Sequence, residues 1–146
     1  MNLPYYRALV VCGSQLRSQW AEEAGRFFPE AEVAVLDAGR LEKQLNTLFE
    51  RAVRLDKPAV AIVSYDTTAR KTDVLLQVPW DDKIVDEATV LKNPNSKRSQ
   101  ALWRLREAGG RAIALTGTPI EKHLDDMGNI IAWTRGDRRL FEGSLR

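Results

Sequence analysis

Short apolar runs alternate along the chain with stretches in which apolar residues recur every three or four positions. Residues 8–12 (ALVVC) and 59–63 (AVAIV) are apolar at every position. Such runs are typical of strands that are buried on both faces of a parallel sheet. The complete set of expected strands is 8–12, 33–36, 59–63, 84–86 and 111–115.

The segments between these runs predict amphipathic helices. Leu16, Trp20, Ala24 and Phe27 form one apolar stripe at helical spacing, and Pro29 would end that helix. The other expected features are a Ser14 cap for this helix, helices over 41–55 and 66–75, a helix from a Ser96 cap to a Gly109-Gly110 stop, and a last helix through 124–131.

Regular alternation of strands and helices predicts one α/β domain over residues 1–146, a three-layer sandwich with a mainly parallel sheet. In open sheets of this class, ligands bind at the carboxyl ends of the strands. The polar segments expected there are Gly13-Ser14-Gln15, Ser64-Tyr65-Asp66, Asp86-Glu87 and Thr116-Gly117-Thr118.

Composition narrows the classes of function without selecting one. A net charge of +2 neither requires nor excludes nucleic acid, although Lys92, Lys97 and Arg98 form a local basic cluster. Cys12 is the only cysteine and His123 the only histidine, which excludes an internal disulfide and metal sites built from several thiolates or imidazoles. No signal-peptide core and no apolar run of roughly 20 residues is present, so we expect a cytoplasmic protein without membrane contact.

The pair Asp86-Glu87 follows an apolar strand, where adjacent carboxylates can hold a hydrated magnesium ion and orient an attacking water. Such a pair alone is more often the solvated start of a loop. Residues 85–97 (VDEATVLKNPNSK), however, resemble the Walker B segment of Swi/Snf-type helicases and translocases, in the DEAD/DEAH-like superfamily 2. Lys92 and Asn93 match that segment, and Thr89 departs at a variable position. The resemblance implies that Asp86 and Glu87 are catalytic, with Asp86 holding magnesium when nucleotide is bound.

Residues 115–121 (LTGTPIE) are similar to the third motif of the same family. Thr116 and Thr118 offer hydroxyls at a strand end, and Gly117 permits a tight turn. An ordinary strand-to-helix turn is the alternative interpretation. The resemblance implies that Thr116, Gly117 and Thr118 couple the nucleotide site to the rest of the motor, although Lys122 stands where the family usually has asparagine.

Two weaker matches occur in the expected order. Residues 8–20 (ALVVCGSQLRSQW) and 63–67 (VSYDT) resemble segments whose loops, in the family, touch the phosphate backbone of one DNA strand. The alternative for each residue singly is an ordinary solvated surface role. The resemblance implies weak, sequence-independent contacts with DNA, and its candidate residues are Ser14, Gln15, Ser64, Thr67, Lys92, Asn93 and Lys97.

The family's phosphate-binding loop is missing from these 146 residues. That loop ends in Gly-Lys followed by Ser or Thr, and none of the nine glycines here is followed by lysine. The family places it after a strand that lies beside the one expected at 111–115. We therefore expect a partial RecA-like lobe without the Walker A strand, which binds no cofactor and hydrolyses no ATP alone. ATP and magnesium would bind only after completion by a partner.

Three interpretations remain open. The chain is part of a split or truncated translocase, in which a partner polypeptide supplies the phosphate-binding loop and the second motor lobe; a homo-oligomer is the other partner considered. Alternatively, it is a non-catalytic DNA- or protein-binding module, or a fragment cut from a longer protein, although the initial Met favours a natural reading frame. Because Asp86, Glu87 and the Thr-Gly-Thr triplet are intact, the first is favoured. We also expect the strands ending at Asp86 and Leu115 to be neighbours, with the 111–115 edge covered by a partner chain or a second copy; the N-terminal segment 3–6 is the competing cover.

Overall fold

The structure is a computed structural model that describes residues 2–87 and 91–115. Its centre is a five-stranded sheet in the order β2-β3-β1-β4-β5, in which every neighbouring pair is parallel. This confirms the predicted α/β class and the predicted neighbours β4 and β5. The strands are β1 (Arg7–Cys12), β2 (Glu32–Val35), β3 (Ala59–Ser64), β4 (Asp82–Val85) and β5 (Arg111–Ala114).

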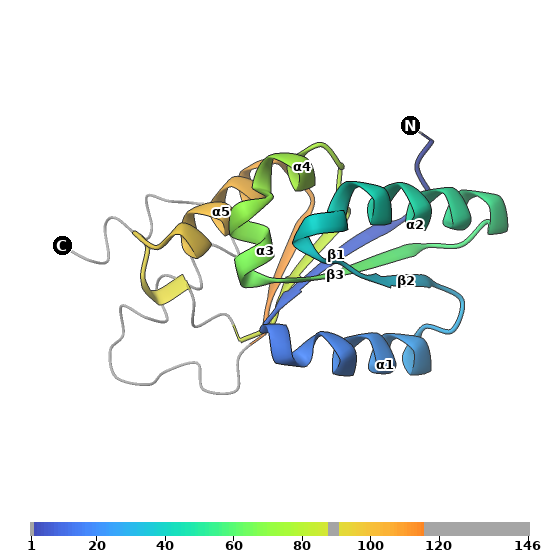
Figure 1. Cartoon of the computed structure of the whole chain (residues 1–146), viewed down its shortest axis with the longest axis horizontal. Coiled ribbons are helices and arrows are strands. Elements are labelled where there is room, and N and C mark those ends of the chain that lie inside the picture. Colours follow the sequence, from blue (N-terminus) through green and yellow to red (C-terminus); the bar gives the residue numbers. More distant parts are fainter. Residues whose placement is uncertain (1, 88–90, 116–146) are drawn as a thin grey trace.

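The helices cover both faces of the sheet, α1 on one and the others on the opposite face (Figure 1). This distribution follows from right-handed crossovers, because the chain moves one way from β1 to β2 and the other way in every later step. No helix within the described ranges is long and apolar enough to cross a membrane. The elements are η1 (Ser14–Leu16), α1 (Arg17–Phe27), η2 (Ala38–Arg40), α2 (Leu41–Leu55), α3 (Tyr65–Arg70), α4 (Thr72–Leu76) and α5 (Lys97–Glu107).

Helix boundaries differ from the expectations in two places. Ser14 does not cap α1, because Ser14 begins the 3-10 turn η1. The cap position of α1 is Leu16, and no side chain makes a capping bond there. The helix expected over 66–75 is two helices, which meet at Lys71. Ser96 does cap α5, through a bond of 3.1 Å from the Ser99 amide. The helix expected through 124–131 lies outside the described residues.

The glycine stop after α5 is confirmed, and the backbone there requires glycine. Gly109 and Gly110 have φ values of 104° and 80°, in the left-handed region. A Cβ atom on Gly110 would lie 2.3 Å from the carbonyl oxygen of Trp80, so no side chain fits this position. The close approach lets the chain turn directly from α5 into β5.

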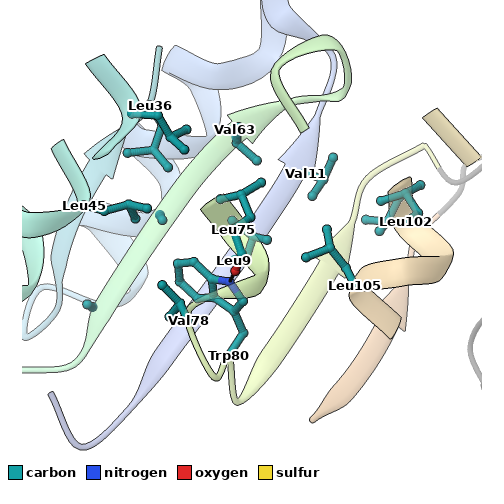
Figure 2. Close-up of a cluster of buried hydrophobic side chains, with 14 of the residues drawn as sticks. Leu9, Val11, Leu36, Leu45, Val63, Leu75, Val78, Trp80, Leu102 and Leu105 are labelled. Atoms are coloured by element: carbon teal, nitrogen blue, oxygen red, sulfur yellow. Dashed lines mark hydrogen bonds between the residues drawn. The ribbon is translucent and has the colours of Figure 1, made fainter. Parts of the chain in front are cut away.

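The main core fills the space between the sheet and the helices α2, α4 and α5 that cover one of its faces (Figure 2). Leu9 on the central strand and Phe49 on α2 are fully buried there. Trp80 packs against Phe49 with 5.8 Å between ring centroids, and its indole N–H donates to the Leu75 carbonyl at 2.9 Å. This core fixes the strands and helices that end at the polar edge of the sheet.

The opposite face is covered less completely. Helix α1 packs against β2 and β3 over Val10, Cys12 and Ile62, and burial raises the pKa of the Cys12 thiol to about 11. Beside α1 an apolar cleft of about 560 Å³ opens over β1 and β4. Farther along the sheet, Ile113 on β5 stands opposite Ile84 on β4 and is 38% exposed. Among the described residues, β5 pairs only with β4, so it forms one edge of the sheet.

Asp82 ties the amino ends of β4 and β5 together. It is buried, and it accepts two bonds from Arg111, of 2.7 Å from Nε and 2.9 Å from Nη2. The Tyr6 hydroxyl donates to the same carboxylate. The bonds from Arg111 hold the pKa of Asp82 below its usual range. The Asp82 carboxylate therefore anchors both the N-terminal segment, through Tyr6, and the edge strand β5, through Arg111.

Lys83 holds the end of α5 against β4. Its side chain is buried, and its ammonium group donates to the carbonyl oxygens of Leu105 and Gly109. Leu105 is in the last turn of α5 and Gly109 follows the helix, so the ammonium group joins the end of α5 to the turn after it. Burial, with a smaller effect from the charge of Arg106, lowers the pKa of Lys83 to about 8.

The depressed pKa predicts a pH dependence of stability in the alkaline range. Between pH 8 and the ordinary lysine pKa of 10.5, the unfolded chain binds more protons at Lys83 than the folded chain does. The free energy of unfolding should therefore rise with pH across this window in the natural chain, relative to Lys83→Met. Urea unfolding of both proteins at several pH values measures the difference. If the free energies of unfolding of the two proteins changed with pH in parallel, the prediction would be contradicted.

Candidate functional site

A polar cleft of about 410 Å³ lies at the carboxyl ends of β1, β3 and β4. It brings together three of the four strand-end segments that the sequence singled out. The fourth, with Thr116, Gly117 and Thr118, lies outside the described residues. The lining residues are Gly13, Ser14, Gln15, Leu16, Ser64, Tyr65, Asp66, Glu87 and Arg98.

Asp86 and Glu87 directly follow β4, and their backbone has a constrained conformation. The Asp86 amide still donates to the Val11 carbonyl at 2.8 Å, which continues the ladder with β1. Its carboxylate Oδ2 accepts the indole N–H of Trp20 on α1, also at 2.8 Å. Glu87 is exposed and has a φ of 55°, in the left-handed region that residues with a Cβ rarely adopt. The Asp86 carboxylate is therefore oriented by the Trp20 side chain, while the position of Glu87 is set by the left-handed backbone of the turn.

The Tyr65 hydroxyl fastens this turn. It donates to the carbonyl oxygen of Glu87 at 2.9 Å and also contacts that of Asp86. Burial, followed by the charge of Asp86, raises the pKa of Tyr65, so the hydroxyl keeps its proton. A left-handed residue other than glycine costs of order 1 kcal/mol, and such conformations persist where surrounding contacts fix them. Tyr65 lies in a segment that the sequence had singled out, but its hydrogen bonds were not predicted.

Asp86 and Glu87 offer the oxygen ligands that magnesium prefers. One Asp86 oxygen already accepts the Trp20 N–H. Within residues 2–87 and 91–115 there is no group of three or more His, Cys, Asp and Glu side chains that could hold a metal ion. The acidic pair fits a metal that takes most of its ligands from phosphate and water.

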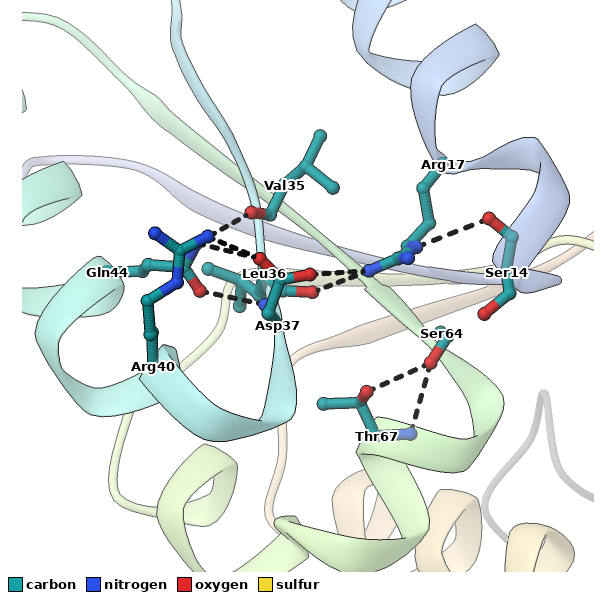
Figure 3. Close-up of polar contacts among 9 residues, drawn as sticks. All are labelled: Ser14, Arg17, Val35, Leu36, Asp37, Arg40, Gln44, Ser64 and Thr67. Carbon is teal, nitrogen blue, oxygen red and sulfur yellow. Dashed lines mark hydrogen bonds and ion pairs between the residues drawn. The ribbon is translucent and has the colours of Figure 1, made fainter.

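Arg17 positions the loop that contains Ser14 and Gln15 through a bond to the Ser14 backbone (Figure 3). The side chains of Ser14 and Gln15 are exposed. Arg17 Nε donates to the Ser14 carbonyl at 3.3 Å, and its Nη1 donates to the Leu36 carbonyl at 3.0 Å and to Asp37 at 3.2 Å. This arginine joins the carboxyl ends of β1 and β2. Its role was missed because two of its three partners, Leu36 and Asp37, lie 19 and 20 residues away in the sequence.

Asp37 continues this network to the outer edge of β2 (Figure 3). Bonds from Arg40 and Arg17 hold the pKa of the Asp37 carboxyl below its usual range. Gln44 on α2 donates to the Val35 carbonyl at 3.1 Å and accepts from the Asp37 amide at 2.8 Å. The carboxamide thus occupies backbone groups that another strand would otherwise use.

Ser64 and Thr67 are both buried and bonded to each other (Figure 3). The Ser64 hydroxyl lies 3.0 Å from that of Thr67 and accepts the Thr67 amide at 3.1 Å, which caps α3. Ser64 lines the cleft, whereas Thr67 does not and holds the Ser64 hydroxyl in place. A direct contact of either with phosphate stays a prediction.

The candidates that follow the acidic pair occupy different environments. Lys92 is half-buried, while Lys97, the first residue of α5, is exposed. Asn93 serves the backbone, since its Oδ1 accepts the Asn95 amide at 3.2 Å and its carbonyl accepts the Ser96 hydroxyl at 3.1 Å. None of these three residues lines the cleft. Arg98 does, although it was not among the predicted site residues.

Comparison with known proteins places most of the chain in one family. Residues 5–137 match the SNF2-related domain. The chain is 27% identical over 147 residues to the TATA-binding protein-associated factor BTAF1 of Arabidopsis thaliana, which covers 98% of this chain and 7% of that protein. It is 29% identical over 120 residues to the ISWI chromatin-remodeling complex ATPase ISW1 of Saccharomyces cerevisiae, which covers 82% of this chain and 10% of that protein.

A solved structure has the same fold. The SWI2/SNF2 ATPase core of Sulfolobus solfataricus, determined in complex with dsDNA, superposes with a TM-score of 0.71 at 28% identity. The match covers 94% of this chain and 27% of that one. The chain therefore spans a small part of the proteins that it resembles.

The Tyr65 contacts predict a local effect of removing its hydroxyl. Tyr65→Phe should lower the free energy of unfolding by about 1 kcal/mol, the usual contribution of one hydrogen bond. It should also accelerate hydrogen exchange at the amides of residues 86 and 87. Tyr5→Phe is the matched control, since Tyr5 is 67% exposed. Equal exchange at Glu87 in both variants would show that the hydroxyl does not hold this turn.

Proposed function

Because the chain belongs to the SNF2-related family of helicase and translocase motors, we propose that it is the part of a first motor lobe whose polar cleft binds the DNA backbone. One observation carries the proposal. The Ser14-Gln15 loop, the start of α3 and the turn at Glu87 converge on a single cleft. The structural relative from Sulfolobus solfataricus was determined with dsDNA, which supports the same ligand here.

The charges around the cleft indicate weak binding. Among the residues that the structure describes, Asp66 and Glu87 line it together with one cation, Arg98. Exposed Ser14 and Gln15 can donate hydrogen bonds to phosphate oxygens, and such contacts position a protein on DNA without reading its sequence. The exposed Lys97 adds a further positive charge at the start of α5. We therefore expect affinity typical of sequence-independent binding.

The acidic pair supplies one half of a nucleotide site. Asp86, oriented by the Trp20 indole, would hold a magnesium ion through its remaining oxygen, while exposed Glu87 would orient a water. Bound magnesium would neutralise charge on the phosphates. The phosphate oxygens must be held by a loop that these 146 residues do not contain. Coupling through Thr116, Gly117 and Thr118 stays part of this proposal.

The sheet has a place for the missing unit. A connection from a strand beside β5 to β1 would cross the sheet in the same direction as the connection from β1 to β2. A right-handed crossover then puts the connecting helix on the α1 face, over β4 and β5. The apolar cleft and half-exposed Ile113 lie on this face. We propose that a partner polypeptide carrying the phosphate-binding loop packs there; a second copy of the chain could cover the same surface but would not supply the loop.

Binding of DNA by the isolated chain is the first test. Fluorescent duplexes of two unrelated sequences should bind equally, with dissociation constants of about 10⁻⁶ to 10⁻⁴ M that weaken steeply from about 50 to about 200 mM salt. Gln15→Glu should weaken binding, because it adds a negative charge to the cleft. Gln77→Glu adds the same charge at the end of α4, before β4, and should change little. Strong preference for one sequence would contradict backbone recognition.

Hydrolysis of ATP is the second test. The 146-residue chain should release no more phosphate from ATP than its Glu87→Gln variant, with or without DNA, because no loop holds the nucleotide phosphates. A coupled phosphate assay on both proteins measures this. Steady release by the natural chain that disappears in Glu87→Gln would overturn the proposal that the nucleotide site is incomplete.

A further inference from the structure

Within residues 2–87 and 91–115, Arg98 is the one cation that lines the polar cleft, and its guanidinium group is paired with an acidic neighbour. It lies on the first turn of α5, and Asp66 lies on the first turn of α3. The Asp66 Oδ1 accepts from Arg98 Nε at 3.0 Å and from Nη2 at 2.5 Å. Both side chains line the cleft together with Ser14, Gln15 and Glu87.

A second ion pair on the same helix has the same chemistry but a different position. Arg104 Nη2 lies 2.7 Å from Asp73 Oδ1 and joins α5 to α4. The arginine side chains of the two pairs are similarly exposed, 48% for Arg98 and 51% for Arg104. Neither Arg104 nor Asp73 belongs to the lining of the cleft. The two pairs therefore differ mainly in what they face.

The Arg98–Asp66 pair contributes little to folding. Solvent-exposed ion pairs contribute about 0 to 1 kcal/mol, and Asp66 is 66% exposed at its side chain. Helix α5 is anchored independently by buried Leu102 and Leu105. Exchanging the carboxylate for another anion would thus cost the fold little.

A phosphate is a suitable replacement for the Asp66 carboxylate. The guanidinium group is planar and always charged, and its fork of donors matches phosphate as well as carboxylate. Asp66 and Glu87, by contrast, repel a phosphate in the same cleft. Arg98 can attract the DNA backbone fully only after it releases Asp66.

From this geometry we infer that Arg98 is a phosphate-binding residue for DNA, and that Asp66 masks it until the backbone enters the cleft. The inference rests on the proposed function of the cleft and adds a recognition residue together with its regulation. The two members of the pair should have opposite effects, since Arg98 favours binding and Asp66 opposes it.

The test compares affinity for a fluorescent duplex among charge-matched variants. Arg98→Gln should weaken binding several-fold and reduce the salt slope by about one phosphate contact. Asp66→Asn should tighten binding several-fold. The controls Arg104→Gln and Asp73→Asn make the same charge changes on the pair outside the cleft, and should alter affinity by less than about twofold. Thermal unfolding checks that all four variants remain folded.

A double-mutant cycle separates masking from general electrostatics. Asp66→Asn should tighten binding only while Arg98 is present, so the effect should disappear in the Arg98→Gln background. Equal tightening in both backgrounds would overturn the masking by Asp66. Equal losses of affinity for the duplex in Arg98→Gln and Arg104→Gln would overturn the role of Arg98.

Two further outcomes identify the source of the phosphate. Titration with ATP in place of DNA should show no difference between the natural chain and Arg98→Gln. A difference for ATP without one for duplex would assign Arg98 to nucleotide and overturn its assignment to DNA. No binding of duplex by the natural chain would overturn both this inference and the proposed function, whereas binding with an unaffected Arg98→Gln variant would overturn this inference alone.

Discussion

The parallel ladder on both sides of β1 is the constraint on which the rest of the molecule depends. It aligns Cys12 with Ser64 on one side and Val11 with Val85 on the other, so three strands end at the same level. The segments that follow must then leave the sheet side by side. A cleft between them is a consequence of the register, and side chains far apart in the sequence line it together.

Two side chains turn this common edge into one connected unit. Arg17 joins the loop after β1 to the end of β2, and Tyr65 joins the start of α3 to the backbone of the acidic turn. Trp20 adds a bond from α1 to the Asp86 carboxylate. Segments attributed to DNA contact are therefore bonded directly to segments attributed to nucleotide. A displacement of one loop by a ligand would be transmitted to its neighbour through these bonds.

Much of the fold could be predicted because buried parallel strands leave an apolar run in the sequence. All five expected strands are present, and the boundaries differ by one or two residues. Local capping was less predictable, since η1 displaced the expected Ser14 cap. The contacts of Arg17, Tyr65 and Arg98 could not be foreseen, because their partners lie between 19 and 32 residues away. Only the folded backbone brings such groups together.

The sheet has two unlike edges. At β2, a strand of only four residues, the Gln44 carboxamide already holds the Val35 carbonyl and the Asp37 amide, and the charged pair Arg51–Glu32 flanks the strand. The β5 edge has no comparable side chain among the described residues. Polymerisation by strand addition requires two receptive edges per subunit, and the described part of this sheet offers at most one. Association of copies through their edges would consequently stop at a closed pair, which protects an incomplete lobe from forming fibres.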